Sequence, residues 1–329
     1  MQTFIDKWVS VNNIVINKNK FPSIYYLKWS NRKCRPYRDI EASFQNKLPK
    51  YTFYRKVKSD SKYIYVIGKF KNQTEYQFRD CCIKHEGFLK SHLQKCIRRG
   101  LIGKSIRTAY SYMATDFQSF IRRLSIIMLE DVMLHKSITT IIWMMMAYPK
   151  WKPALEQVEW LLGVVHFLAS CKKYDKISNE KVLNNTNNLD IIYSLEIRKS
   201  FGGMHGDIDM IDNYIIKWNN RFSKGEIPNE FNQKIKIVDE KSIIDLEKND
   251  IEYAAVDFHC FKVIIRWIQD NFIQYDDEEI KKAIWYGSSG YNKRHEKNIL
   301  CTCDKKYKDI WYEIKSEYYK IVRYLIKNL

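Results

Sequence analysis

Residues 62–99 read KYIYVIGKFKNQTEYQFRDCCIKHEGFLKSHLQKCIRR, and the period of the hydrophobic pattern changes within this stretch. From Lys62 to Lys71, apolar and aromatic residues alternate with polar ones at a period of two, which is typical of a β-strand. From about Lys84 onward, apolar residues return every three or four positions, which is typical of an amphipathic helix. The stretch therefore predicts a small sheet followed by a helical region.

The segments outside this stretch extend both patterns. Tyr51–Lys58 and Thr74–Arg79 also alternate at a period of two, so three strands are expected to form a small antiparallel meander. Helices are expected near residues 84–98, 105–116, 117–135, 137–148, 154–173, 188–201, 207–222, 253–274, 276–286 and 304–328, and polar loops near 172–188 and 223–250. The predicted fold class is α+β and mostly α-helical. A basic, aromatic-rich N-terminal region at 1–83 contains the small antiparallel sheet, and a larger helical domain follows at 84–329.

The composition is that of a folded chain. Of the 329 residues, 45% are hydrophobic and 15% are aromatic, which excludes a disordered or low-complexity protein. The longest apolar run, Ile138–Tyr148, is shorter than the roughly 20 residues that span a bilayer. Residues 1–20 hold no apolar core of a signal peptide, and the eight cysteines are interpreted as free thiols. We therefore expect an intracellular protein, nuclear or cytoplasmic, that is not secreted and has no membrane partner.

Positive charge is concentrated in the first third of the chain. Residues 1–110 contain 24 Lys and Arg against 7 Asp and Glu, whereas residues 111–329 contain 32 against 31. Such a field attracts polyanions, and a nucleic-acid backbone fits it best, because neutralised phosphates release their counterions. Tyr, Phe and Trp are interleaved with the cations, a mixture that suits single strands, whose bases stack on rings. The alternative is that the rings form the core of the small sheet and the cations its solvated face.

The candidate nucleic-acid-binding residues are cations in two places. Seven lie in the N-terminal region, and four lie at a junction between two predicted helices. They are Arg32, Lys33, Arg35, Arg38, Arg55, Lys56 and Lys58, together with Arg98, Arg99, Lys104 and Arg107 at the junction.

The junction contains part of a P-loop pattern. Gly103, Lys104 and Ser105 match its end, but the pattern also needs a glycine at position 98, which is Arg98, and a buried strand before it. ATP hydrolysis is therefore not expected, and Gly100 is expected to end the preceding helix.

Metal-ligand residue types cluster just before this junction. His85, His92 and Cys96 follow Cys81 and Cys82 within 16 residues, and His92 and Cys96 share a helical face. The spacing matches no strong zinc pattern, so we expect free thiols and surface histidines, and no metal site.

A glycine-rich turn followed by three carboxylates, Gly202–Asp212, is the sharpest local feature of the chain. Such a group could hold Mg²⁺ for phosphoryl chemistry, which makes Asp207 and Asp209, with Asp257 from a later segment, weak catalytic candidates. Asp207 and Asp209 lie about 200° apart around a helix, however, and cannot converge. We expect instead that the glycines end one helix and that the aspartates begin the next, where the helix dipole favours anions.

One segment resembles part of a known family. Ser91–Gly100 (SHLQKCIRRG) is followed by Ala109 and Met113 and then by Ile121–Val132 (IRRLSIIMLEDV). The Gln-Lys-x-x-Arg and Arg-Arg-Leu…Glu-Asp motifs resemble the C-terminal helical domain of clamp-loader-like replication ATPases of the RarA/MgsA (WHIP) type, over about residues 91–135. The chain shows none of that family's Walker motifs. The resemblance therefore implies a helical module for assembly and contact around replicating DNA, without motor activity.

These observations favour an accessory protein of replication, repair or transcription that binds the phosphate backbone of DNA or RNA through its basic N-terminal third. Its helical domain would then contact protein partners of such an assembly. Two alternatives stay open. One is a metal-dependent nuclease or nucleotidyltransferase that uses the Asp207/Asp209 region, the one case in which a cofactor, Mg²⁺, is expected. The other is a structural component of a nucleoprotein particle.

Overall fold

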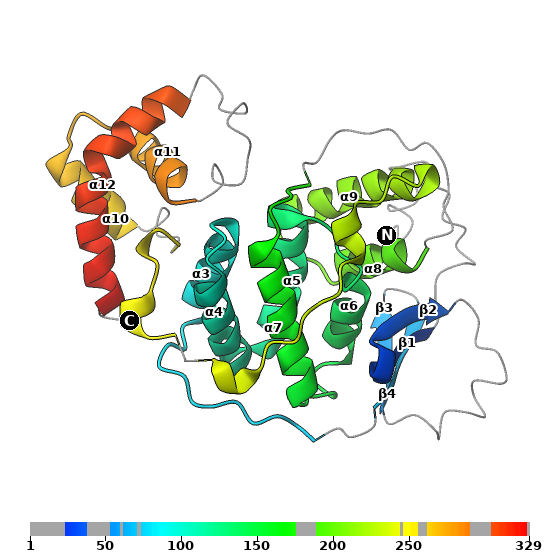
Figure 1. Ribbon diagram of the computed structural model, residues 1–329. Coiled ribbons are helices and arrows are strands. Elements are labelled where there is room, and N and C mark those ends of the chain that lie inside the picture. Colours follow the sequence, from blue (N-terminus) through cyan, green and yellow to red (C-terminus); the bar gives the residue numbers. More distant parts are fainter. Residues whose placement is uncertain are drawn as a thin grey trace. The chain divides into compact units, whose positions relative to one another are not determined.

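The computed structural model describes residues 24–37, 53–59, 62–70, 74–175, 189–243, 246–255, 262–289 and 304–327 (Figure 1). The chain divides into two units, each of which is built from three segments. Unit 1 contains residues 1–76, 124–157 and 175–234, and unit 2 contains residues 77–123, 158–174 and 235–329. The single boundary near residue 83 that the composition suggests stays a prediction.

Unit 1 carries a four-stranded sheet. Its strands are β1 (Ile24–Lys28), β2 (Lys33–Tyr37), β3 (Phe53–Ser59) and β4 (Lys62–Lys69). β1 pairs with β2 and β3 pairs with β4, both antiparallel, and the two pairs join through β1 and β4, which run parallel. The strand order is therefore β2-β1-β4-β3.

The predicted strands are correct in part. Two of the three are β3 and β4, but Thr74–Arg79 is not a strand, and the Tyr76 N–H donates to the backbone oxygen of Pro153 (2.8 Å). β1 and β2 lie outside the predicted strands. Pro36 interrupts the pattern of β2, and it is tolerated because β2 is an edge strand. The expected all-antiparallel meander is wrong for the parallel β1–β4 pair, since long-range pairing leaves no local signal in the sequence.

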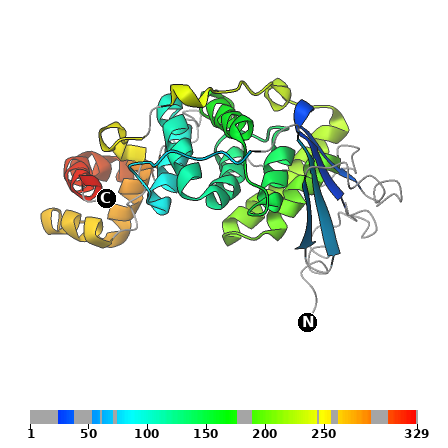
Figure 2. The same cartoon turned by 90° about the horizontal axis from the view of Figure 1, so that it is seen from below.

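Helices cover one face of this sheet. α6 (Ile138–Ala147) and α8 (Leu189–Ser200) lie against the strands, and Figure 2 shows the helices of this unit on one side of the blue strands. Every residue of α6 is buried, so this apolar run is a core helix. The indole N–H of Trp143 donates to the backbone oxygen of Ile67 (2.9 Å), and its ring packs against Phe53, with centroids 5.5 Å apart.

The other described elements of unit 1 are helical. It contains the end of α5 (Phe117–Ile127), a π-helical turn (Met128–Val132), the start of α7 (Leu155–Ser170), α9 (His205–Lys224) and a 3-10 turn (Asn229–Asn232). α9 buries an apolar stripe that includes Ile211, Ile215 and Trp218, and it ends at Gly225, whose φ of 73° is the left-handed conformation that favours glycine.

In its described residues, unit 2 consists of helices and irregular segments. Its helices are α3 (Glu86–Arg98), α4 (Ile102–Thr115), α10 (Lys262–Asn271), α11 (Asp277–Ser288) and α12 (Asp304–Lys327), with most of α5 and α7. α3 packs against α4, and α11 packs against α12. A capping box at Asp276 and Glu279 begins α11. Gly100, with a φ of 67°, follows the end of α3 as the sequence predicts.

The 235–255 segment, which the structure describes at 235–243 and 246–255, has an irregular backbone there with three 3-10 turns, Glu240–Ser242, Lys248–Asp250 and Tyr253–Ala255. Although the sequence predicts a polar loop here, Ile235, Ile243 and Leu246 are buried. The Val238 N–H donates to the backbone oxygen of Glu159 on α7 (3.3 Å), so this segment packs directly on that helix.

Ten α-helices, α3 to α12, lie within the described residues, and they confirm a mostly helical α+β fold with a small sheet in the N-terminal region. Two predicted helices differ from the structure. The helix expected at 117–135 gives way to the π-helical turn after Ile127, and the one expected at 253–274 contains a 3-10 turn and α10. No helix among the described residues has the length and apolar character needed to cross a membrane.

Candidate nucleic-acid interface

The sheet has an outer face, opposite the face that packs on the helices. Side chains alternate along each strand. Tyr25 and Leu27 of β1 are fully buried, as are Ile64 and Val66 of β4, whereas Tyr26 and Lys28 of β1 and Tyr63 and Tyr65 of β4 are more exposed. The exposed residues of the outer sheet face are Lys28 of β1, Lys56 and Lys58 of β3, and Tyr63 and Lys69 of β4.

Two of these lysines stand beside rings. In the register of β3 and β4, Lys58 is opposite Tyr63 and Lys56 is opposite Tyr65. The Nζ of Lys56 lies 3.9 Å from the ring centroid of Tyr63 and 5.6 Å from that of Tyr65. The side chain of Tyr63 is 50% exposed, so the outer sheet face presents a ring next to cations.

The described residues do not compensate the charge of this face. The four strands contain no Asp or Glu at all. No carboxylate among the described residues forms an ion pair with Lys28, Lys56, Lys58 or Lys69. Within the part of the chain that the structure describes, the outer sheet face is therefore a positive surface without a paired carboxylate.

The other candidates from the N-terminal region lie elsewhere. Arg55 is on the inner face of β3, where its guanidinium donates to the backbone oxygens of Met146 (3.0 Å) and Ala147 (3.1 Å) at the end of α6. Arg32 is half-buried in the turn between β1 and β2, with a φ of 51°. Arg55 thus caps a helix, and Arg32 shapes a turn.

The remaining three candidates are placed only by the backbone or not at all. Lys33 and Arg35 of β2 stand at register positions opposite Lys28 and Tyr26 of β1. Arg38 lies outside the described residues.

At the helix–helix junction, two predicted phosphate ligands instead bind carbonyl oxygens of unit 2. Arg98 donates to the backbone oxygen of Ser289 (3.4 Å), and Arg99 donates to that of Ser288. These oxygens lie at the C-terminus of α11, where the helix dipole favours cations. Both arginines therefore cap α11.

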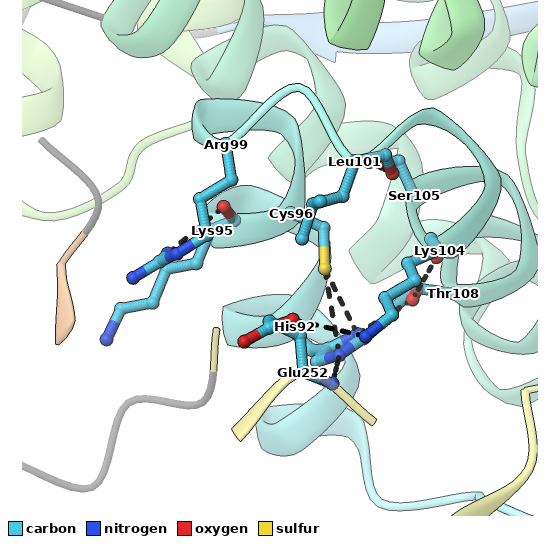
Figure 3. A network of polar contacts seen from close by, with 9 residues as sticks. All are labelled: His92, Lys95, Cys96, Arg99, Leu101, Lys104, Ser105, Thr108 and Glu252. Atoms are coloured by element: carbon cyan, nitrogen blue, oxygen red, sulfur yellow. Dashed lines mark hydrogen bonds and ion pairs between the residues drawn. The ribbon is translucent and has the colours of Figure 1, made fainter. Parts of the chain in front are cut away.

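The other two junction cations pair with carboxylates of the 246–255 segment. Lys104 contacts Glu252 (Figure 3), with 3.1 Å between Nζ and Oε2. Arg107 pairs with Asp250. These acids follow the cations by more than 140 residues, so no local pattern could reveal the pairing. The four junction cations are engaged within unit 2, whereas no described carboxylate pairs with the lysines of the outer sheet face.

His92 of α3 is fully buried in the same region, where it links three elements (Figure 3). Its Nε2 accepts a hydrogen bond from the Glu252 N–H (3.0 Å), so the ring proton lies on Nδ1, which donates to Thr108 Oγ1 (2.8 Å). The Thr108 hydroxyl donates to the backbone oxygen of Lys104 (2.6 Å). Burial, with Lys104 and Arg99 as further causes, lowers the pKa of His92 to about 3. The expectation of a surface histidine is therefore wrong for His92, which is a neutral structural residue.

Acid should destabilise unit 2 through His92. The unfolded side chain binds a proton near pH 6.5 and the folded one only near pH 3, so stability present above pH 6.5 is lost as the pH falls. The loss through this residue should reach about 2 kcal/mol by pH 5. In urea unfolding, the His92→Gln variant, which lacks the titrating group, should lose less stability than the wild type between pH 7 and pH 5.

The wild type and the His92→Gln variant must be compared because Glu196 of unit 1 has the opposite effect on stability as the pH falls. Burial raises the pKa of Glu196 to about 8, so its contribution to stability increases as the pH falls from 8 towards 4.5. This contribution is common to the wild type and the His92→Gln variant and drops out of their difference. An unchanged pH dependence in the variant would contradict the role of His92.

The aspartates after the glycine-rich turn do not converge. Asp207 is in the first turn of α9, and Asp209 follows two residues later, about 200° around the helix. Asp209 forms an exposed pair with His205 (2.8 Å). Gly202, with a φ of 74°, lies between α8 and α9, as the structural interpretation predicts. Asp257, the third catalytic candidate, lies outside the described residues.

No group of three or more His, Cys, Asp or Glu within the described residues is arranged to hold a metal ion. His92 and Cys96 do meet, with ring nitrogens 3.6 and 3.7 Å from the sulfur. Burial raises the pKa of the Cys96 thiol to about 12, so the sulfur stays protonated and is a poor metal ligand.

Lys28, Tyr63 and Lys69 of the outer sheet face belong to the interleaved rings and cations of the sequence but not to the candidate nucleic-acid-binding residues chosen from it. The signal that could have found them is the period of two, which assigns alternate strand residues to opposite faces. The same signal would have placed Arg55 on the face opposite to that of Lys56 and Lys58.

Comparison of the chain with family models, curated proteins and solved structures found no match.

Proposed function

We propose that this protein binds nucleic acid through phosphate contacts of the outer sheet face and acts as an accessory factor in replication, repair or transcription. The observation that carries the proposal is the set of four exposed lysines on strands that contain no acidic residue. A polyphosphate backbone is the ligand for which such a surface gains most, because several neutralised phosphates release counterions together.

The helical part of the chain is proposed to contact protein partners. The segment that resembles the RarA/MgsA (WHIP) helical domain forms the end of α3, α4, α5 and the π-helical turn. On this proposal, the sheet holds the nucleic acid and these helices hold other proteins of the assembly. An intracellular location, nuclear or cytoplasmic, belongs to the same proposal.

The proposal is tested by titrating labelled DNA and RNA oligonucleotides with the full chain at two salt concentrations. Affinity should fall steeply with salt, by about 0.7 units of log K per unit of log salt for each phosphate contacted on a single strand. The absence of binding at low salt would end the proposal.

Charge reversal locates the binding surface. The double variant Lys56→Glu/Lys58→Glu should weaken binding about tenfold or more and lower the salt dependence, because two phosphate contacts are lost. The matched control is Lys308→Glu/Lys315→Glu on α12, which changes the net charge equally at two exposed lysines. If both double variants weaken binding to the same extent, the outer sheet face is not the binding surface.

A further inference from the structure

Tyr63 is exposed on a strand whose other apolar residues are largely buried. Half of its side chain is in solvent, whereas Ile64, Val66 and Ile67 of the same strand are at most 1% exposed. Tyr63 therefore adds little to the core of unit 1. Its ring is available to a ligand that offers a flat surface of its own.

The surroundings of this ring suit an alternating ligand. Lys56 lies over the ring at 3.9 Å from its centroid, and Lys58 is its register partner on β3. A nucleic-acid strand alternates bases with phosphates along its length, so a ring flanked by two cations matches both parts of the repeat.

We propose that Tyr63 stacks on a base, and that the ligand of the outer sheet face is therefore single-stranded nucleic acid rather than duplex. This inference rests on the proposed function and names its substrate class. In a duplex the base faces are covered by their neighbours and only the edges reach the grooves, so an exposed ring on a sheet has nothing to stack on. In a single strand the bases are free to stack, and four-stranded sheets that stack bases on their rings are an established mode of recognition.

The cation beside the ring has a role in the same step. When a base occupies the ring face, the Lys56 ammonium leaves the Tyr63 ring and moves to the adjoining phosphate. One cation–ring contact is then exchanged for a base–ring contact and a charged hydrogen bond. The two residues thus bind the two parts of one nucleotide.

A second exposed ring provides a comparison. Tyr312 of α12 is 55% exposed and has Lys315 at 4.6 Å from its ring centroid. α12 contains four acidic residues among its cations, however, whereas the strands that surround Tyr63 contain none. The strands around Tyr63 therefore carry cations without an acidic residue, whereas the helix around Tyr312 carries both charges.

The test compares three ligands in binding titrations of the full chain at one salt concentration. They are a single strand of ~10 nucleotides, the same strand with abasic sites in place of its bases, and the corresponding duplex. The wild type should bind the complete strand about tenfold more tightly than the other two. Tyr63→Ala should reduce affinity for the complete strand to that for the abasic strand, and should leave the abasic strand unaffected.

Two further variants serve as controls. Tyr63→Phe keeps the ring and should keep the preference for bases, whereas Tyr312→Ala should change nothing. If the wild type binds complete and abasic strands equally, with the expected salt dependence, base stacking is wrong and phosphate binding stands. If it binds none of the three at low salt, both proposals are overturned. Equal affinity for the duplex, or a loss of base preference in Tyr312→Ala instead of Tyr63→Ala, would also overturn the inference.

Discussion

Replacing Gly163 with alanine should destabilise this protein by about 3 kcal/mol or more, although alanine is normally the better helix residue. Gly163 lies in α7, where the backbone of the 235–255 segment crosses the helix. A Cβ at this position would lie 1.9 Å from the backbone oxygen of Lys236 and 2.9 Å from the Ile235 side chain. Because the closest atom belongs to the backbone, the whole segment would have to move, and its contact with α7 would be lost.

The matched control is Gly103 of α4, also in unit 2. A Cβ there would meet no atom within 4 Å, so Gly103→Ala should stabilise the protein by roughly 0.5–1 kcal/mol through helix propensity alone. Urea unfolding of both variants measures the difference. If Gly163→Ala were as stable as the wild type, the close packing of the segment on α7 would be incorrect.

Replacing Asp175 with alanine should cost about 3–5 kcal/mol in unit 1. The Asp175 carboxylate is 5% exposed and contacts Lys217 at 2.7 Å and Arg221 through two hydrogen bonds of 2.7 and 2.9 Å. It also accepts from the Trp218 indole at 3.1 Å. Removal of this carboxylate takes away the counter-charge that two largely buried cations of α9 share.

Backbone hydrogen bonds hold Asp175 in the position from which its carboxylate contacts α9. Its N–H donates to the backbone oxygen of Val132 (2.7 Å), and its oxygen accepts from the Tyr214 hydroxyl (2.7 Å). The exposed carboxylate of Asp209, also paired with a residue of α9, is the control, and Asp209→Ala should change stability by less than about 0.5 kcal/mol. Similar losses for the two variants would contradict a special role for Asp175.

The helices could be predicted from the sequence because their signals are local. The apolar stripe of α9 and the glycine that precedes it both lie within one short segment. The helix predicted at 117–135 was wrong in its second half, where the helix type changes without a local signal in the sequence. After Ile127 the chain enters a π-helical turn, although the apolar period continues through it.

The sheet could be predicted only in part because half of its pairing is not local. β3 and β4 are neighbours in the chain and follow the period of two, so their pattern was sufficient. β1 and β2 are five residues long, and β2 contains Pro36, which argues against a strand unless the strand lies at an edge. The edge position follows only from the parallel β1–β4 pair.

The candidate nucleic-acid interface could also be predicted only in part, because the contacts of its cations are not local. Charge counting located the cations but could not separate those that the fold engages from those that have no ion pair among the described residues. Arg107 and Asp250 are far apart in the sequence, as are Arg55 and the carbonyl oxygens at the end of α6. Lys56 and Lys58 remain exposed because alternation places them on the face away from the helices. Burial and pairing, rather than residue type, distinguish the two groups.

The most direct test of the proposed interface is photo-crosslinking of the full chain to a single strand that carries 5-bromouracil, followed by mass spectrometry of the linked peptides. The outer sheet face predicts cross-links to β3 and β4, foremost to Tyr63, that disappear at high salt. Cross-links confined to α12 or to the segment around Arg98 and Arg107, with none on the sheet, would contradict it.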